Sequence, residues 1–174
     1  MLSTERLILR AWRDDDCTAF AALNADPIVM RFFPAPLARE QSDALLARIR
    51  SRMAEQGFGL WAVEEKHSGE CCGFVGLNRV DAALPFAPAV EISWRLALRF
   101  QGQGYATEAA QRVLEAGFNH YQLAEIVSFT TLQNLPSQRV MIKLGMTRCG
   151  EFDHPLLPAG HPLMRHVLYR KASG

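Results

Sequence analysis

The chain has 174 residues, of which 49% are hydrophobic and 21% charged, as is typical of one globular domain with a sizeable core. We therefore expect a single domain over residues 1–174. The 19 Lys and Arg almost balance the 18 Asp and Glu, and the resulting formal charge of +1 argues against general binding of nucleic acid or of a membrane surface.

The sequence shows neither a membrane span nor a targeting signal. No apolar run reaches the roughly 18 to 20 residues that a membrane helix needs. The N-terminal residues up to Arg13 alternate polar and apolar side chains and do not build the apolar core of a signal peptide. These features predict a soluble, cytoplasmic protein.

The first third of the chain predicts a short strand and two helices. Residues 7–11 alternate in the manner of a strand, and the three aspartates at 14–16 supply N-cap and first-turn acids for a helix to about Leu23. Residues 27–36 contain three prolines but are too apolar for an idle linker, so we expect them to line a pocket. Residues 40–56 carry apolar side chains at helical spacing and are followed by Gly57, where a helix should end.

The remaining chain predicts a mixed sheet. Three strand-like runs at 58–65, 71–80 and 90–96 have short or polar links, which suggests an antiparallel meander. A helix at 105–120 and a strand at 124–131 complete a crossover unit. A helix at 136–144 and a strand pair at 146–152 and 165–171 follow. The whole predicts an α+β fold with a central mixed, mostly antiparallel sheet flanked by helices.

Disulfide and metal chemistry are not expected. Cys71 and Cys72 are adjacent, whereas Cys17 and Cys149 lie far away, so there is no Cys-x-x-Cys pair. The histidines between positions 154 and 166 match no common set of metal ligands. We therefore expect no metal in the protein.

The turn between strand 90–96 and helix 105–120 is the most informative segment. Gly102 and Gly104 precede a helix, where unpaired backbone N–H groups and the positive end of the helix dipole favour an anion. Glycines also let the backbone approach phosphate oxygens closely. A dinucleotide fingerprint would need glycine where Thr107 stands, and a P-loop would need Gly-Lys followed by Ser or Thr. We therefore expect a diphosphate site of another kind, with a plain tight turn as the alternative.

Two motifs carry a resemblance to a known family. Residues 101–106, Gln-Gly-Gln-Gly-Tyr-Ala, resemble the Q/R-x-x-G-x-G/A diphosphate loop of the GNAT superfamily of N-acetyltransferases. Residues 134–146 are similar to the N-x-x-S-x-x-x-x-x-K-L-G-F segment of its Rim-type branch, the ribosomal-protein N-terminal acetyltransferases, with Met146 in place of Phe. Residues 104–109, 4–10 and 26–30 also look like that branch, so the resemblance covers nearly the whole chain.

The resemblance implies a V-shaped opening between the fourth and fifth strands, where the pantetheine arm of acetyl-CoA lies like a missing strand. An edge opened between two strands offers backbone groups to a ligand amide. Asn134 would bond pantetheine, with a turn role as its alternative. The implied cofactor-binding residues are Ile92, Ser93, Trp94, Gln101, Gly102, Gln103, Gly104, Tyr105, Ala106, Thr107 and Asn134.

Acetyl transfer needs a neutral amine, an acceptor for its proton and a group that stabilises the oxyanion or the departing thiolate. Glu91, beside the opening, is the candidate base, with a structural strand acid or a water chain as alternatives. Ser137 is the candidate donor to the sulfur, with helix N-capping as its alternative. The tyrosine that serves this purpose in many members of the superfamily is missing, since the nearby positions are Met141, Leu144 and Met146.

The acceptor is predicted from two segments. Phe32 and Phe33 stand where the Rim-type branch builds its acceptor wall, and Asp153, in the tail opposite, is expected to bind one ammonium group. A near-neutral protein offers little steering for polycations. We therefore predict direct transfer, in a ternary complex, to a protein or peptide N-terminal amine. A polyamine, an amino acid or an antibiotic as acceptor, and a non-catalytic acyl-CoA-binding module, are the alternatives, and the sequence leaves a homodimer open.

Overall fold

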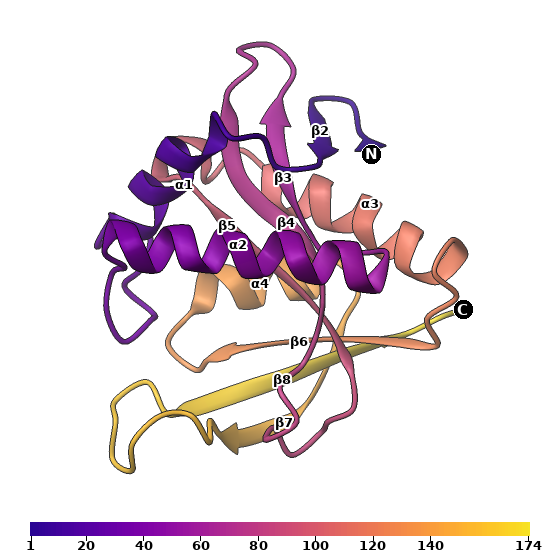
Figure 1. Ribbon diagram of the computed structural model, residues 1–174. Helices are drawn as coiled ribbons and strands as arrows, with labels where there is room; N and C mark the ends of the chain where they lie inside the picture. Colours follow the sequence, from indigo (N-terminus) through magenta and orange to yellow (C-terminus); the bar gives the residue numbers. More distant parts are fainter.

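An eight-stranded sheet organises the computed structural model, which describes residues 1–174 (Figure 1). The strands are Leu2–Ser3 (β1), Leu7–Arg10 (β2), Leu60–Glu65 (β3), Cys71–Arg79 (β4), Val90–Leu96 (β5), Glu125–Thr131 (β6), Thr147–Asp153 (β7) and Arg165–Ala172 (β8). The helices are Asp16–Ala25 (α1), Arg39–Gln56 (α2), Tyr105–Asn119 (α3) and Leu135–Lys143 (α4), with a 3-10 turn at Leu98–Phe100. The strand order in the sheet is β1-β2-β3-β4-β5-β6-β8-β7.

All neighbouring strands are antiparallel except β5 and β6. β4 and β5 pair continuously, from Gly73 opposite Leu96 to Arg79 opposite Val90. The parallel strands β5 and β6 pair at one position alone, where Glu91 lies opposite Val127. The two strands therefore diverge, and Figure 1 shows β6, β7 and β8 running across the direction of β3 and β4.

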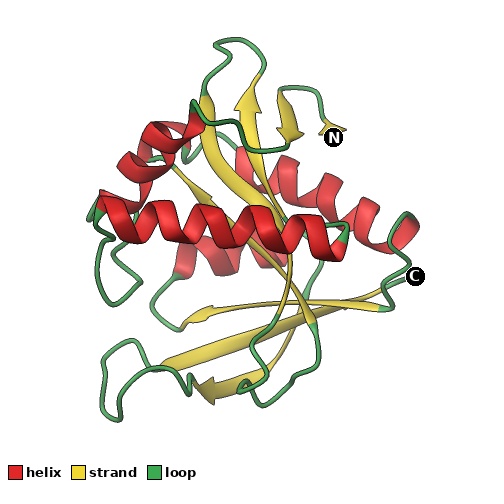
Figure 2. Cartoon of the chain, viewed as in Figure 1, coloured by secondary structure: helices red, strands yellow, loops and turns green.

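Helices cover both faces of the sheet (Figure 2). α1 and α2 pack on one face, where Phe20 of α1, Leu46 of α2 and Phe74 of β4 belong to one apolar cluster. On the other face, Val113 of α3 and Met141 of α4 belong to a larger cluster of 23 buried residues. Because side chains alternate along a strand, each face of the sheet supplies one of these two cores.

The predicted α+β architecture is confirmed, including the meander, the crossover unit and the final strand pair. The two-residue strand β1 was not predicted, so the predicted fourth and fifth strands are β5 and β6. Helix α2 ends as predicted at Gly57, which has φ of 76° and donates its amide to the Met53 carbonyl. None of the helices combines the length and the apolar character needed to traverse a bilayer.

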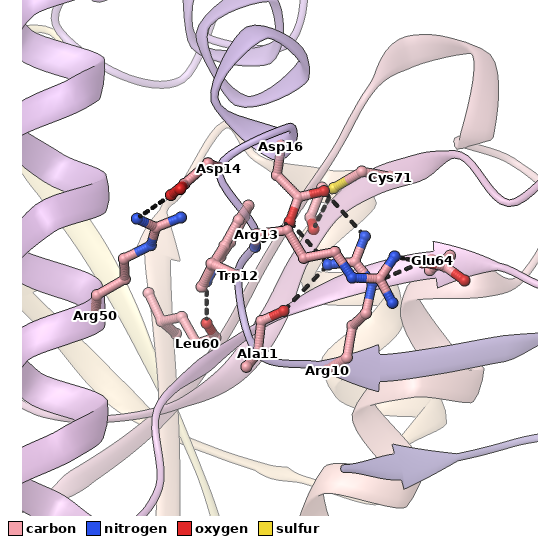
Figure 3. Close-up of polar contacts among 11 residues, drawn as sticks. Arg10, Ala11, Trp12, Arg13, Asp14, Asp16, Arg50, Leu60, Glu64 and Cys71 are labelled. Atoms are coloured by element: carbon pink, nitrogen blue, oxygen red, sulfur yellow. Dashed lines mark hydrogen bonds and ion pairs between the residues drawn. The ribbon is translucent and has the colours of Figure 1, made fainter.

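Arg10 is the centre of a buried ion-pair cluster near the start of the chain (Figure 3). Its Nη1 and Nη2 atoms donate to the two carboxylate oxygens of Asp16 at 2.8 and 2.9 Å, and its Nε donates to Glu64 at 2.6 Å. Burial alone would raise the pKa of Asp16, but hydrogen bonds from Arg10 and from the Arg13 amide hold that pKa below its ordinary value. The cluster therefore joins β2, α1 and β3 with its charges paired.

Candidate active site

A cavity of about 820 Å³ lies where β5 and β6 diverge. Ser128 Oγ on β6 donates to the Ile92 carbonyl on β5 at 3.0 Å, next to the single paired position at Glu91. Beyond this point, the edge of β5 from Ser93 to Leu96 has no partner strand on the β6 side. This free edge offers backbone donors and acceptors to a ligand.

The turn after β5 borders the same cavity. Gly102 and Gly104 have φ of 74° and 83°, in the left-handed region that favours glycine. A Cβ atom on Gly102 would meet no atom within 4 Å, so the turn faces open space. Helix α3 has no side-chain N-cap, and the Glu108 amide makes its first bond, to the Gly104 carbonyl. The amides before Glu108 are therefore free to bind an anion.

Polar side chains hold this turn from outside. Arg6 Nη1 donates to the Gln103 carbonyl at 3.0 Å, and Arg6 Nε pairs with Glu108 at 2.7 Å. The Gln101 side chain donates to the Leu96 carbonyl at 2.8 Å. The turn is thus fixed in an anion-binding conformation by bonds within the chain.

Five residues of β5 line the cavity, namely Glu91, Ser93, Trp94, Arg95 and Leu96. Alternation along the strand places Glu91, Ser93 and Arg95 on one face, whereas Ile92 and Leu96 belong to the core beneath α3. Glu91 and Arg95 are four residues apart on this strand, so their Cα atoms are separated by roughly 13 Å. One strand face therefore presents a carboxylate and a guanidinium to the same cavity.

Glu91 lies at the one position where β5 and β6 pair, opposite Asn78 of β4. Burial raises the pKa of Glu91 to about 7, because desolvation of the carboxylate outweighs a hydrogen bond from Asn78 and the charge of Arg52. A carboxyl group with this pKa is partly ionised at neutral pH and accepts a proton readily, as a general base must.

Arg95 occupies the other end of this face. Its guanidinium carbon lies 4.4 Å from the ring centre of Phe33 and 5.3 Å from that of Phe74. Nη1 donates to Asn24 Oδ1 at 2.6 Å, while Nε is buried and has no hydrogen-bond partner. Burial lowers the pKa of Arg95 to about 10, and no carboxylate opposes this effect.

Two segments form walls on either side of the cavity. The connection between α1 and α2 supplies one wall, with Phe32 and Phe33, and the region between β7 and β8 supplies the other, with Leu156 and Leu157. His154 belongs to the second wall, and burial lowers its pKa, which keeps its imidazole neutral at neutral pH. Both walls are largely apolar.

Comparison with known proteins identifies the family of this chain. Residues 6–147 match the acetyltransferase (GNAT) domain family. The chain belongs to the GNAT acetyltransferase family. It is 33% identical over 146 residues to the uncharacterized protein YkkB of Bacillus subtilis, which covers 83% of this chain and 84% of YkkB.

Two further GNAT-related proteins resemble this acetyltransferase along almost its full length. The uncharacterized N-acetyltransferase YnaD of Bacillus subtilis is 30% identical over 161 residues, covering 92% of this chain and 89% of YnaD. The crystal structure of a GNAT-family acetyltransferase from Bacillus anthracis superposes with a TM-score of 0.83 at 25% identity, covering 99% of this chain and 98% of the other.

As a GNAT protein, the chain is an acetyl-CoA-dependent N-acetyltransferase. This sets aside the alternative of a non-catalytic acyl-CoA-binding module. The geometry fits the cosubstrate, because the turn offers free amides to a diphosphate and the open edge of β5 offers backbone groups to an amide-containing arm.

Most residues predicted from the sequence line the cavity of the acetyltransferase. They are Phe32, Phe33, Glu91, Ser93, Trp94, Gln101, Gly102, Gly104, Tyr105, Ala106, Thr107, Asn134 and Ser137. Three predicted residues are not among its lining. Ile92 is fully buried in the core. The Gln103 side chain turns away to donate to the Arg99 carbonyl at 2.7 Å.

Asp153 is the third predicted residue outside the cavity. Its carboxylate pairs with Arg165 at 3.2 Å on the exposed side of the β7–β8 pair. Alternation explains this position, because the neighbouring Phe152 points inward to the rings of Phe86 and Phe129. The structure therefore does not place Asp153 where it would bind the ammonium group of an acceptor.

Asn134 caps helix α4. Its Oδ1 accepts from the Ser137 amide at 3.2 Å, and its Nδ2 donates to Thr130 Oγ1 at 2.9 Å. The alternative that Ser137 is the N-cap is therefore wrong, since Ser137 stands at the third helical position. The Ser137 hydroxyl lines the cavity and is not needed as a cap.

Arg95, Arg52 and Asn78 also line the cavity, although none of them is predicted from the sequence. A signal for Arg95 was present, because a strand that turns Glu91 to the cavity turns every second residue the same way. Arg52 and Asn78 come from α2 and β4, and tertiary packing alone brings them to Glu91.

Proposed function

We propose that the enzyme acetylates the N-terminal amine of a peptide or protein, as the Rim-type branch does, by direct attack on acetyl-CoA in a ternary complex. Glu91 accepts the amine proton, either directly or through one water molecule. The observation that carries this proposal is the position of Glu91, with a pKa of about 7, at the base of the β5–β6 opening.

The cosubstrate is proposed to follow β5 from the glycine turn toward Glu91. The diphosphate binds the amides of residues 102–107 at the start of α3. The Ile92 carbonyl already accepts from Ser128, and the backbone groups of Ser93 face β4, so the pantetheine amides pair with the backbone of Trp94, the next residue that faces the opening. Asn134 retains one N–H and one oxygen lone pair beyond its capping bonds, which suffice for one pantetheine amide.

The proposed reaction needs two proton movements. The amine nitrogen attacks the thioester carbonyl carbon, the C–S bond breaks, and the amine loses its proton to Glu91. Ser137 donates a hydrogen bond to the departing sulfur, which leaves as a thiolate and takes up a proton from solvent, while Glu91 releases the amine proton to solvent. Because thioesters are reactive, holding the amine and the carbonyl in line supplies much of the acceleration.

The acceptor end is proposed to lie between Phe32 and Phe33 on one wall and Leu156 and Leu157 on the other. Proteins of the same fold include the ribosomal-protein-S5-alanine acetyltransferase from Vibrio fischeri, with 20% identity and a TM-score of 0.73. They also include a spermidine N-acetyltransferase from Vibrio cholerae, with 19% identity and a TM-score of 0.77. Since both acceptor classes occur on this fold, the choice between them rests on this chain's own cavity.

An acceptor panel tests the proposed function. The enzyme is incubated with acetyl-CoA and a peptide that has a free N-terminal Ala or Ser, with its N-acetylated counterpart as blocked control, and with spermidine and an aminoglycoside. We expect one acetyl group on the free N-terminus by mass spectrometry and none on the blocked peptide. Highest kcat/KM with spermidine or the aminoglycoside, with peptides inert, would remove the enzyme from the N-terminal class.

The Glu91→Gln variant tests the proposed base. It keeps the shape of the side chain and removes the carboxylate, so we expect kcat to fall roughly a hundredfold while the dissociation constant for acetyl-CoA stays the same. Glu125→Gln, on the exposed side of β6, is the matched control and should leave kcat unchanged. Equal loss in both variants, or none in Glu91→Gln, would contradict the assignment.

A further inference from the structure

We propose that Arg95 is an acceptor-binding residue, and that the acceptor therefore carries a carboxylate or another anionic group in addition to its amine. This rests on the proposed acetyl transfer at Glu91. It adds a recognition element at the far end of the same strand face, and it narrows the acceptor to a molecule with both charges.

Arg95 has no counter-charge within the protein. Buried guanidinium groups are ordinarily paired with carboxylates, because an unpaired buried charge is costly. Arg10, the other deeply placed arginine of the sheet, has both Asp16 and Glu64 within hydrogen-bond distance. Arg95 has the neutral amide of Asn24 and the rings of two phenylalanines, and no carboxylate. A ligand is the natural source of the missing negative charge.

Arg95 keeps a donor atom that the protein does not use. Asn24 takes one hydrogen bond from Nη1, and the two rings hold the guanidinium plane. Nη2 makes no hydrogen bond to the protein and is not buried, whereas Nε is buried. Nη2 is therefore the donor that a ligand carboxylate can reach, in a charge-assisted hydrogen bond.

Arg95 lies on the side of the cavity away from the glycine turn. Its guanidinium lies over Phe74, a member of the apolar cluster beneath α1 and α2. The glycine turn belongs to the opposite face, since Phe100 and Tyr105 on either side of it are part of the core beneath α3. Arg95 is therefore turned toward the acceptor walls and away from the diphosphate.

The charged residues that line the cavity also favour an acceptor with an anionic group. On the side of α1, α2 and β4, the lining arginines outnumber the lining carboxylates. The arginines are Arg31, Arg52, Arg79 and Arg95, and the carboxylates are Asp81 and Glu91. Such a lining attracts an anionic group and repels a polycation such as spermidine.

The spacing of the two charged residues sets the size of the acceptor. Glu91 and Arg95 are roughly 13 Å apart at their Cα atoms, so an amine at one and an anion at the other are several bonds apart. A peptide with Glu or Asp shortly after its N-terminus meets this requirement, and so does an amino acid whose amine and carboxylate stand at opposite ends of a chain. The shared chemistry is an amine and a carboxylate separated by a short spacer.

Matched acceptors test the inference on the wild-type enzyme at saturating acetyl-CoA. One pair is the tripeptide amides Ala-Glu-Ala and Ala-Gln-Ala, and the other is 6-aminohexanoate and its amide. In at least one pair we expect the carboxylate member to have a kcat/KM roughly tenfold or more above its neutral partner, as a charged hydrogen-bonded pair predicts. The pair that shows the difference identifies the source of the anion.

Variants of the protein then locate the effect. Arg95→Met should remove the preference by raising the KM of the carboxylate acceptor roughly tenfold or more, while the KM of acetyl-CoA stays the same. Asn24→Ala is the control, because it removes the hydrogen-bond partner of Arg95 and leaves the charge. This variant should keep the preference for the carboxylate member.

Three results would overturn the inference or its basis. Equal kcat/KM within both acceptor pairs on the wild type would show that no anion is recognised. A rise in the KM of acetyl-CoA alone in Arg95→Met would assign Arg95 to the cosubstrate. If no amine is acetylated, the proposed function fails instead, and calorimetric binding of the acid and amide members in the presence of CoA still decides on Arg95, with equal affinities contradicting its role.

Discussion

Arg10 and Arg95 are both arginines in the sheet of this acetyltransferase, yet the protein surrounds them in opposite ways. Arg10 has a side chain only 8% exposed and is bonded to Asp16 and Glu64 through three donor atoms. Arg95 lies over two phenylalanine rings, bonds to a neutral amide and has one buried donor without a partner. The chain itself supplies the opposite charges for Arg10, whereas it supplies no opposite charge for Arg95.

Glu91 belongs with Arg95 in this comparison. Burial keeps its pKa at about 7, whereas Asp16, also buried, has a pKa held below its ordinary value by Arg10 and the Arg13 amide. The ion-pair cluster around Arg10 therefore stabilises the fold through its paired charges. The face of β5 carries charges that burial disfavours, and such groups are common where a protein performs chemistry.

Arg10→Met should produce the largest loss of stability. The substitution leaves Asp16 and Glu64 buried without their common partner, so we expect the free energy of unfolding to fall by roughly 3 to 5 kcal/mol. Chemical denaturation at pH 7 measures it. Arg13→Gln is the control, because Arg13 is 63% exposed and its pairing with Glu64 should contribute no more than about 1 kcal/mol. If Arg10→Met lowers the free energy of unfolding as little as Arg13→Gln does, Arg10 does not stabilise the fold in the way that distinguishes it from Arg95.

Glu91→Gln should stabilise the protein at high pH. The folded-state pKa of Glu91 is raised from 4.5 to about 7, so the folded state prefers the protonated carboxyl. The free energy of unfolding of the wild type is therefore not reduced by this group below pH 4.5, and it falls as the pH rises from 4.5 to about 7. At pH 8 the variant escapes this loss, and we expect its free energy of unfolding to exceed that of the wild type by roughly 3 kcal/mol.

The same comparison at pH 5 is the control for Glu91→Gln. There the folded wild type holds the proton, so the two proteins should differ by less than about 1 kcal/mol. Denaturation curves at both pH values give the difference directly. A variant less stable than the wild type at pH 8 would mean that the Glu91 carboxylate is paired in the folded state.

Arg95→Met should have the smallest effect on stability of the three substitutions. It removes a charge that burial disfavours and one hydrogen bond to Asn24, so we expect a change of no more than about 1 kcal/mol. Comparison with Arg10→Met under the same conditions separates an arginine that maintains the fold from one that is available to a ligand. A loss above 3 kcal/mol would give Arg95 the structural role of Arg10.

The sequence predicts the fold well because local signals and the long-range pattern agree. Alternation in 90–96, the glycines at 102 and 104 and the helix that follows each have a local cause, and all three appear in the structure. The two-residue strand β1 has no such signal, since it exists through its pairing with β2. Short edge strands of this kind depend on their partner.

The site was less predictable, and the reasons differ among its residues. Glu91 and the glycine turn follow from the motif and from strand geometry. Asp153 lies outside the cavity because the phase of alternation along β7 is set by the packing of Phe152, which the sequence does not reveal. Burial raises the pKa of Glu91, and Asn78 and Arg52, which lie far away in the chain, offset part of this rise. Such tertiary surroundings have no local sequence signature.

The pH dependence of kcat/KM tests the central claim most directly, namely that the charges held apart on β5 serve the reaction. The rate is measured at saturating acetyl-CoA with a peptide acceptor and is expressed per concentration of neutral amine. The ionisation of the acceptor amine then does not affect the pH profile. For the wild type we predict a rise with slope one that levels off above a pKa of about 7, and for Glu91→Gln a low and flat profile. A flat wild-type profile, or the same rise in Glu91→Gln, would contradict the account.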